Sequence, residues 1–472
     1  VPLPKNDEAV VTLYTMTTLE ELGLLKMDFL GLRNLTVIND TEKMLQKEDP
    51  GFSIEKMPLD DPAVFQMLSA GDTGGVFQLE SGGMRRMITQ LQPTSMEDII
   101  AAISLYRPGP MESIPKYVDC RHHPEHVTYL TEKLRPILEV TYGCIVYQEQ
   151  VMQICRELGG YSYGQADLVR RAMSKKKADV MAKERTHFLE GCKKNGVPEA
   201  AASRIFDEMS SFAAYAFNKS HAAAYALVAY QTAYLKCHHP KEYMAALLTS
   251  ILDNTNKVIE YIEECGRLGI KVLPPRINES GEGFTVTPEG IRFGLLAVKN
   301  LGAGVIREVI AQREENGPFA SFLDFYRRMY GGELNKRSVE SLIKSGALDG
   351  LGANRRQMLE GYPKAGEVLA ARERWRSTGQ ISLFGDEPDD EELSLPLVDE
   401  DSPSVLLAGE KEVTGLYISG HPMSHYEALY PKYGVVKLVR VTDPEQNQSY
   451  DNTSIYVMGM ITAKRLKLTK SG

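Results

Sequence analysis

The sequence predicts a multidomain α+β protein in which helices predominate. Its 472 residues are enough for about three or four domains of ordinary size. Hydrophobic residues make up 43% of the chain, a usual share for a protein with buried cores. Apolar residues recur at helical spacing from about 130 to 270, whereas strand-like alternation is confined to short stretches. We therefore expect a long helical block between smaller mixed segments.

Breakers and caps set the expected element boundaries, with Asn195-Gly196 ending one helix and Pro274-Pro275 ending the helical block. Helices are expected at 34–47, 147–158, 164–173, 178–194, 198–211, 220–237, 240–252 and 255–268, with helix pairs continuing to about 370. Strands are expected at 22–32, 284–286, 291–293, 454–461 and 464–469.

The composition excludes two classes of protein. No run of about 18 or more apolar residues occurs, so no membrane-spanning helix is expected. The six cysteines form no Cys-x-x-Cys pair, which indicates a cytoplasmic protein rather than a disulfide-stapled one. The net charge is −9, yet residues 170–194 hold nine Lys or Arg against three Asp or Glu, and acids gather at 386–412. This segregation predicts a cationic working surface and an acidic linker.

Lys26 and Asp28 are candidate site residues on the first strand. Residues two apart on a strand point to the same side, so the ammonium and the carboxylate would project together. A carboxylate is a ligand that Mg²⁺ prefers, and a nearby lysine would face phosphate oxygens. A solvated charge pair on an edge strand is the alternative interpretation.

A basic helix and a turn form a second group of candidates. Arg171 and Lys175 share a helical face next to Arg170, which suits a triphosphate or a DNA backbone, although solvated surface charge explains the same pattern. The turn at 217–221 precedes a helix whose first residues are small, with Ser220 as the expected N-cap. A ligand docked there would be surrounded by Asn218, Lys219, His221 and Tyr225. A capped core helix is the alternative.

Two further motifs suit DNA handling. The hairpin Gly302-Ala303-Gly304, after Lys299, has the form of a helix–hairpin–helix, whose N–H groups bind phosphate without reading bases. Residues 342–359 look like a degenerate second copy, and a purely structural helix pair is the alternative. The peptide at 380–384, Gln-Ile-Ser-Leu-Phe, lies in a polar segment and offers Leu383 and Phe384 as anchors for a partner's groove. The alternative is a loop that packs on its own domain.

Several short motifs occur in a fixed order over nearly the whole chain: Leu25-Lys-Met-Asp-Phe-Leu-Gly31, Val76-Phe-Gln-Leu-Glu80, Leu105-Tyr-Arg-Pro-Gly-Pro110, Tyr147-Gln-Glu-Gln-Val-Met152, Arg170-Arg-Ala-Met173, Phe217-Asn-Lys-Ser-His221, Leu273-Pro-Pro275 and Gly420-His-Pro422. With these motifs the chain resembles the catalytic alpha subunits of bacterial DNA polymerase III, of the type without a built-in exonuclease. The resemblance implies a palm remnant with a mixed sheet at 1–50, largely helical fingers at 51–275, a helix–hairpin–helix domain that binds duplex and clamp at 276–435, and the start of an OB-fold at 436–472.

The resemblance also implies residue roles. Asp28 would be a catalytic, metal-binding aspartate. The triphosphate and the nascent base pair would be contacted by Lys26, Arg107, Arg170, Arg171, Lys175, Asn218, Lys219, His221 and Tyr225. Duplex DNA would be held by Lys299, Gly302 and Gly304. The sliding clamp, or beta subunit, would be bound by Gln380, Leu383 and Phe384.

The implied function is template-directed DNA synthesis by a two-Mg²⁺ mechanism. The implied partners are primer–template DNA, deoxynucleoside triphosphate (dNTP), the sliding clamp and other replicase subunits, with no membrane. The family's other two catalytic aspartates lie upstream of Asp28, so a chain beginning at Val1 is expected to be part of a longer protein and inactive alone. The alternative function is a non-catalytic module that tethers DNA and clamp.

Overall fold

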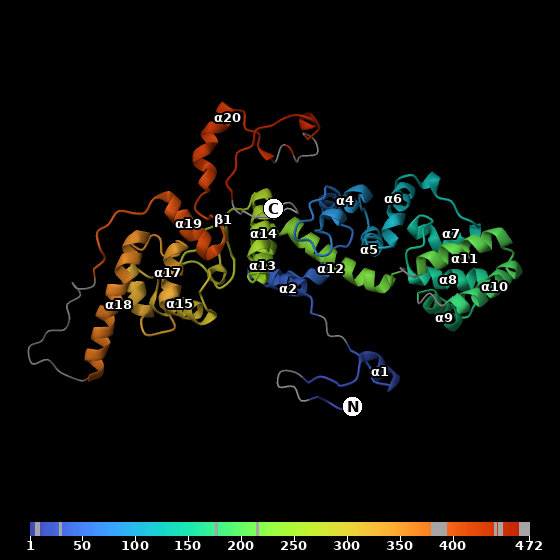
Figure 1. The fold of residues 1–472 in the computed structure, drawn as a ribbon, viewed down its shortest axis with the longest axis horizontal. Helices are drawn as coiled ribbons and strands as arrows, with labels where there is room; N and C mark the ends of the chain where they lie inside the picture. Colours follow the sequence, from blue (N-terminus) through green and yellow to red (C-terminus); the bar gives the residue numbers. More distant parts are fainter. Residues whose placement is uncertain are drawn as a thin grey trace, which may run out of the picture.

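The computed structural model describes residues 1–4, 10–27, 31–174, 178–213, 217–378, 394–438, 441 and 447–461, and it is mostly helical (Figure 1). Helices α7–α11 lie at one end of the molecule and α15–α18 at the other, with α12–α14 between them. No helix in the described part of the chain combines the length and apolar character that a membrane crossing needs. The α-helices are α1 Met16–Glu21, α2 Arg33–Leu45, α3 Pro62–Ser69, α4 Gly82–Leu91, α5 Met96–Leu105, α6 Ile114–His122, α7 Arg135–Leu138, α8 Gln148–Gly159, α9 Tyr163–Ser174, α10 Ala178–Lys194, α11 Glu199–Ala213, α12 Lys219–His238, α13 Pro240–Ser250, α14 Thr255–Arg267, α15 Ala303–Asn316, α16 Phe322–Met329, α17 Lys336–Lys344, α18 Arg355–Thr378, α19 Pro403–Thr414 and α20 Tyr430–Tyr433.

The predicted helical block is confirmed, and α10 has the predicted bounds. Helices α8, α9, α10 and α11 pack around one core that contains Ile154, Leu158 and Phe188. Glycines allow α8 and α10 to cross closely, since a Cβ at Gly191 would lie only 2.0 Å from the carbonyl oxygen of Gly159. This bundle fixes the position of the basic helix α9.

Helix α12 connects the two halves of the helical block. Its 20 residues span about 30 Å at the usual rise per residue. It packs against α3 and α5 and also against α2 and α13. Buried alanines, including Ala222, Ala226 and Ala229, make this close packing possible because they leave room for neighbouring backbone. One end of α12 holds predicted site residues, and the other end enters a buried ion network.

That ion network centres on Lys236, whose side chain has no exposed surface. Its Nζ donates to Asp72 Oδ1 at 2.5 Å and to Glu264 Oε1 at 2.7 Å. Burial alone would raise the pKa of Asp72, but the Lys236 ammonium, together with smaller contributions from Glu264 and Arg267, lowers the pKa below its usual value. The network joins the Gly-rich turn at 71–75 to α12 and α14, and Arg267 completes it through Glu264. The turn is therefore part of the core rather than a free loop.

The sheet found among the described residues is small and mixed, and it confirms the strands predicted at 284–286 and 291–293 to within one residue. The mixed sheet implied for 1–50 is not found among the residues described there. Strands β1 Val272–Leu273, β2 Thr285–Thr287 and β3 Gly290–Arg292 have the order β1-β3-β2, with β1 parallel and β2 antiparallel to β3. The sheet lies between the helical block and α15–α18, whose side chains share its core.

Two strand predictions are wrong for the residues that the structure describes. Residues 22–23 form a turn, 24–27 have no regular secondary structure, and 31–32 lead into α2. Leu25 is 90% exposed, so it has no face to bury and no ladder to join. At the other end, 454–461 contributes only the single bridge from Tyr456 to Val435. The palm and OB-fold assignments therefore stay predictions, and 464–469 lies outside the described residues.

Candidate functional site

Two sequence motifs meet where α8 and α12 begin. Tyr147 and Phe217 form a parallel β-bridge, and the Gln148 N–H donates to the Phe217 carbonyl at 2.9 Å. Asn218, rather than the predicted Ser220, caps α12 by accepting the His221 N–H at 2.8 Å. Ser220 is already the second residue of the helix, so it lies two residues too late for that role. The bridge brings residues about 70 positions apart into one site.

A line of aromatic rings extends from this meeting point. The Arg107 guanidinium lies 4.2 Å from the centre of the Phe217 ring. The Phe217 ring packs edge-on against His221, and His221 lies 4.3 Å from Tyr225 in a tilted stack. Tyr225 in turn contacts Phe77 at 5.3 Å between ring centres. The arrangement offers a cation followed by π faces, which suits a phosphate and a base.

Arg170 and Arg171 reach the same site from α9. Arg170 Nη1 donates to Gln148 Oε1 at 3.1 Å, and Arg170 Nη2 donates to Asp167 Oδ1 at 2.7 Å. Arg171 Nε lies 2.8 Å from Asp167 Oδ2, and its side chain is 64% exposed. Hydrogen bonding from Arg170, with the charge of Arg171 adding to it, lowers the pKa of Asp167. Asp167 thus stays ionised and holds the two guanidinium groups side by side.

Lys219 supplies a fourth cation. Its Nζ lies 3.0 Å from Glu97 Oε2 and 5.2 Å from the centre of the Tyr147 ring. Its backbone N–H donates to both carboxylate oxygens of Glu149. We call the set Arg107, Arg170, Arg171, Asn218, Lys219, His221 and Tyr225 the finger cluster. Arg170 and Arg171 pair with Asp167, Lys219 pairs with Glu97, and Glu149 accepts the Lys219 backbone N–H. With Arg107, the four cations exceed these three carboxylates by one positive charge.

Three of the residues predicted to contact metal or triphosphate are not placed in the finger cluster. Asp28 and Lys175 lie outside the described residues. Lys26 is exposed in the segment before α2, which Figure 1 shows apart from α7–α11. Among the residues that the structure describes, no group of three or more His, Cys, Asp or Glu could hold a metal ion. The predicted metal site is therefore not tested here.

The helix–hairpin–helix region differs in detail from the prediction. Before the hairpin, the expected helix is a single 3₁₀ turn at Leu295–Ala297. Gly302 is the N-cap of α15, and a Cβ at Gly304 would collide with the Glu333 carboxylate. Lys299 Nζ donates to the Glu412 carbonyl at 3.0 Å. The Glu333 carboxylate therefore already lies at the N-terminus of α15, where a DNA phosphate was expected.

The second hairpin is the more regular one. Helices α17 and α18 flank a turn in which Gly346, Gly350 and Gly352 all have positive φ. The Glu400 carboxylate accepts the N–H groups of Arg355 and Arg356 at 2.9 and 3.2 Å. The predicted degenerate copy is thus a pair of helices, α17 and α18, joined by a glycine-containing turn. Glu400 of the same chain caps the N-terminus of α18.

The predicted clamp peptide, with Gln380, Leu383 and Phe384, lies outside the described residues. Its two flanks are both attached to α18. Leu395 packs where a Cβ at Gly361 would be, and Asn354 Nδ2 donates to the Val398 carbonyl at 2.9 Å. The segment that begins at 394 thus packs on the same helix that ends at Thr378.

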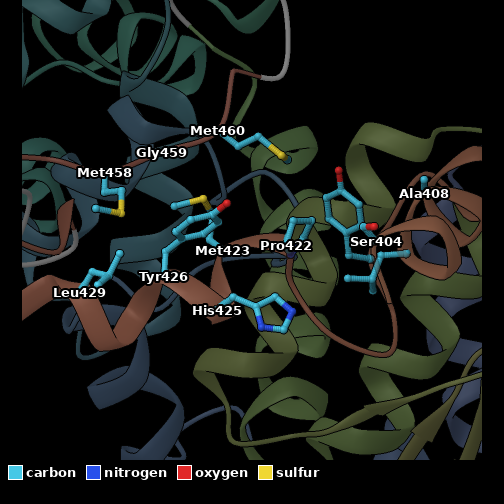
Figure 2. A pocket seen from close by; sticks show the side chains of 12 residues that line it. Ser404, Ala408, Pro422, Met423, His425, Tyr426, Leu429, Met458, Gly459 and Met460 are labelled. Atoms are coloured by element: carbon cyan, nitrogen blue, oxygen red, sulfur yellow. The ribbon is translucent and has the colours of Figure 1, made fainter. Parts of the chain in front are cut away.

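An apolar cavity of about 750 Å³ lies between α19 and the C-terminal part of the described chain. Figure 2 shows Met423, Met458 and Met460 around Tyr426. None of the predicted site residues lines it.

Comparison with known proteins matches the sequence of this chain to a family. Residues 34–196 match the bacterial DNA polymerase III alpha subunit finger domain, and 269–358 match the helix-hairpin-helix motif. A DNA polymerase III subunit alpha from Thermus aquaticus is 49% identical over 440 residues, which are 91% of this chain and 35% of that protein. The chain belongs to the bacterial DNA polymerase III alpha subunit family.

Alpha subunits from other bacteria are similar to this chain over a comparable range. The subunit of Escherichia coli (strain K12) is 42% identical over 98% of this chain and 41% of its own length. That of Bacillus subtilis (strain 168) is 43% identical over 93% of this chain and 39% of its own length. The chain thus spans well under half the length of these alpha subunits.

Sequence reasoning missed the acids that organise the finger cluster. Asp167 pairs with Arg170 and Arg171 at helical spacing within α9, whereas Glu97 on α5 and Glu149 on α8 reach the start of α12 across the fold. Periodicity carries no signal for the latter contacts. The motif Tyr147–Met152 contains Glu149, but the sequence alone assigns no role to this motif.

Proposed function

We propose that this chain carries the nucleotide-binding and duplex-holding parts of a replicative DNA polymerase. The complete enzyme would transfer a nucleotidyl group from dNTP to a primer 3′-hydroxyl under template direction. The observation that carries the proposal is the convergence of Arg107, Arg170 and Lys219 on one site next to the rings of Phe217, His221 and Tyr225, in a chain of this family.

The cations suit a triphosphate. Guanidinium groups bind phosphate oxygens through paired N–H donors, so Arg170 and Arg171 would exchange Asp167 for the ligand. Lys219 would likewise release the Glu97 carboxylate and bind a phosphate oxygen of the ligand. Because the pairs with Arg171 and Lys219 are partly exposed, each costs little to break. The His221 and Tyr225 rings would then pack against the nascent base pair.

Mg²⁺ does not fit the described carboxylates of this site. Asp167, Glu97 and Glu149 each already accept hydrogen bonds from cations or backbone N–H groups. We therefore assign no metal to them. Asp28 remains the proposed metal ligand, together with carboxylates elsewhere in the complete protein. Asp28→Ala in the complete protein should abolish incorporation, and unchanged incorporation would remove Asp28 from the mechanism.

We also propose that residues 269–358 hold product duplex and that the 380–384 peptide binds the sliding clamp. The match to the helix-hairpin-helix motif supports the first proposal. The second proposal is supported by the sequence of the peptide, which offers Leu383 and Phe384 as apolar anchors in a polar segment. A module that only tethers DNA and clamp would need these parts but not the finger cluster.

Single-nucleotide incorporation by the complete alpha subunit tests the proposal. Arg170→Ala should raise KM for dNTP about 10- to 100-fold, since a charge-assisted hydrogen bond is worth about 1.5–3 kcal/mol. Arg204→Ala, an exposed arginine on α11, is the matched control and should match wild type. Equal KM values for the two variants would remove the finger cluster from nucleotide binding and favour the tethering module.

A further inference from the structure

The first turn of α8 contacts both halves of the finger cluster. Gln148 accepts the Arg170 guanidinium through its side chain and bonds the Phe217 carbonyl through its N–H. Glu149, the next residue, contacts the N-terminus of α12. This turn belongs to the motif Tyr147–Met152, to which neither the sequence nor the proposed function gives a role. The contacts make it the junction between the basic helix α9 and the ring-bearing helix α12.

The Glu149 carboxylate makes the most contacts at this junction. Its Oε1 accepts Asn218 Nδ2 at 3.0 Å and the Lys219 N–H at 3.2 Å, and its Oε2 accepts the Lys219 N–H at 3.1 Å. The first N–H groups of a helix have no partner within the helix. A carboxylate there satisfies a donor and also complements the positive end of the helix dipole. Glu149 therefore caps α12 from a segment about 70 residues away.

This cap sets the direction of the rings. Asn218 donates its side-chain amide to Glu149, while its side-chain oxygen accepts the His221 N–H at 2.8 Å. Both ends of the Asn218 amide are thus fixed. His221 follows in the first turn of α12, and its ring packs on Tyr225. A change at Glu149 would be transmitted through Asn218 to the face that the rings present.

We propose that Glu149 is a positioning residue for the incoming nucleotide. It would hold the N-terminus of α12 at a fixed place relative to Arg170, through a single helical turn of α8. Phosphate contacts from α9 and ring contacts from α12 would then be preformed rather than assembled at each binding event. The inference rests on the proposed function, because it needs dNTP to bind the finger cluster.

The test is dNTP binding and incorporation by the complete alpha subunit on primer–template DNA. Glu149→Ala should raise KM for dNTP about tenfold, equivalent to about 1.4 kcal/mol, while kcat changes by less than about threefold. Glu149→Gln keeps one acceptor oxygen and should recover part of the loss. Glu157→Ala is the matched control, since it removes an exposed acid from the other end of α8. If Glu149→Ala does not fold, Glu149→Gln carries the test alone.

Hydrogen exchange supplies a second measurement. In Glu149→Ala without ligand, the amides of 218–222 should exchange faster than in wild type, while those of 199–213 in α11 should not change. KM and kcat both like those of Glu157→Ala would overturn the proposal. A lowered KM would overturn it too, because it would make Glu149 a competitor of the triphosphate. Absence of dNTP-dependent incorporation by wild type would instead refute the proposed function.

Discussion

Replacing Lys236 by Met should destabilise the centre of the molecule by about 3 kcal/mol. Removing one partner of a buried ion pair costs about 3–5 kcal/mol, because the other charge is left buried and unpaired. Here Glu264 is only 2% exposed and would keep Arg267 as its partner, whereas Asp72 is 39% exposed and would regain water. These two features place the loss at the lower end of the range. Met fills nearly the same volume, so no large cavity adds to it.

Double substitution separates the charge from the packing. Glu264→Gln alone should also destabilise, because Lys236 would lose its more deeply buried partner. The variant with both changes should lose less than the sum of the single losses, with a coupling of about 1–3 kcal/mol between contacting residues. Lys193→Met removes an exposed lysine from α10 and should change stability by less than about 0.5 kcal/mol.

Hydrogen exchange in increasing urea is the suitable assay, because it follows the amides of 71–80 and of α12 separately. In Lys236→Met both segments should open at lower urea than in wild type, by about 1 M or more for an m-value of about 1–3 kcal/mol/M. The core of α8–α11 should respond less. If the single variants lose under about 1 kcal/mol, or if their losses simply add, the network does not hold the Gly-rich turn on α12.

Three other outcomes are expected. Glu333→Gln should tighten duplex binding about two- to fivefold at low salt, because it removes a negative charge next to Gly304. The gain in affinity should fade as salt rises, and binding titrations that show no gain would contradict this prediction. Changing Leu383 and Phe384 to Ala should weaken clamp binding by about 2 kcal/mol or more without altering DNA binding, and equal clamp affinity would rule the motif out. Burial would raise the pKa of Asp98, but the Arg121 guanidinium lowers it. The ionised Asp98 carboxylate therefore stabilises the fold at neutral pH, and this stabilisation is lost as pH falls below about 4. In urea titrations between about pH 3 and 7, the stability of Asp98→Asn should lack this pH-dependent contribution.

Much of the helical fold could be predicted from sequence because local signals decide it. Apolar periodicity and the turn at Gly196 suffice for α10, whose observed bounds are those predicted. The strand at 22–32 failed because alternation alone cannot make a ladder, and Leu25 has no partner surface among the described residues. Ser220 was chosen as the cap of α12 on residue type, whereas Asn218 takes the role through its position relative to Glu149.

The finger cluster was predicted as a set of cations and rings but not as an arrangement. Arg170 and Lys219 stand out in the sequence because basic residues in a motif suggest phosphate. Glu97 does not stand out, since surface acids are common and its pairing with Lys219 depends on tertiary packing, whereas Asp167 lies three residues before Arg170 on the same helix and could have been found from helical spacing. The same holds for Lys236, which reads as an ordinary lysine in an apolar helix and is fully buried.

Hydrogen exchange of the complete alpha subunit on primer–template DNA, with and without the matching dNTP, tests the central claim most directly. Binding should protect the amides of 147–150 and 217–225, and should leave those of 303–316 in α15 unchanged. A non-matching dNTP should protect them less. If the matching dNTP leaves 217–225 exchanging as in its absence, the finger cluster does not bind the incoming nucleotide, and the account is wrong.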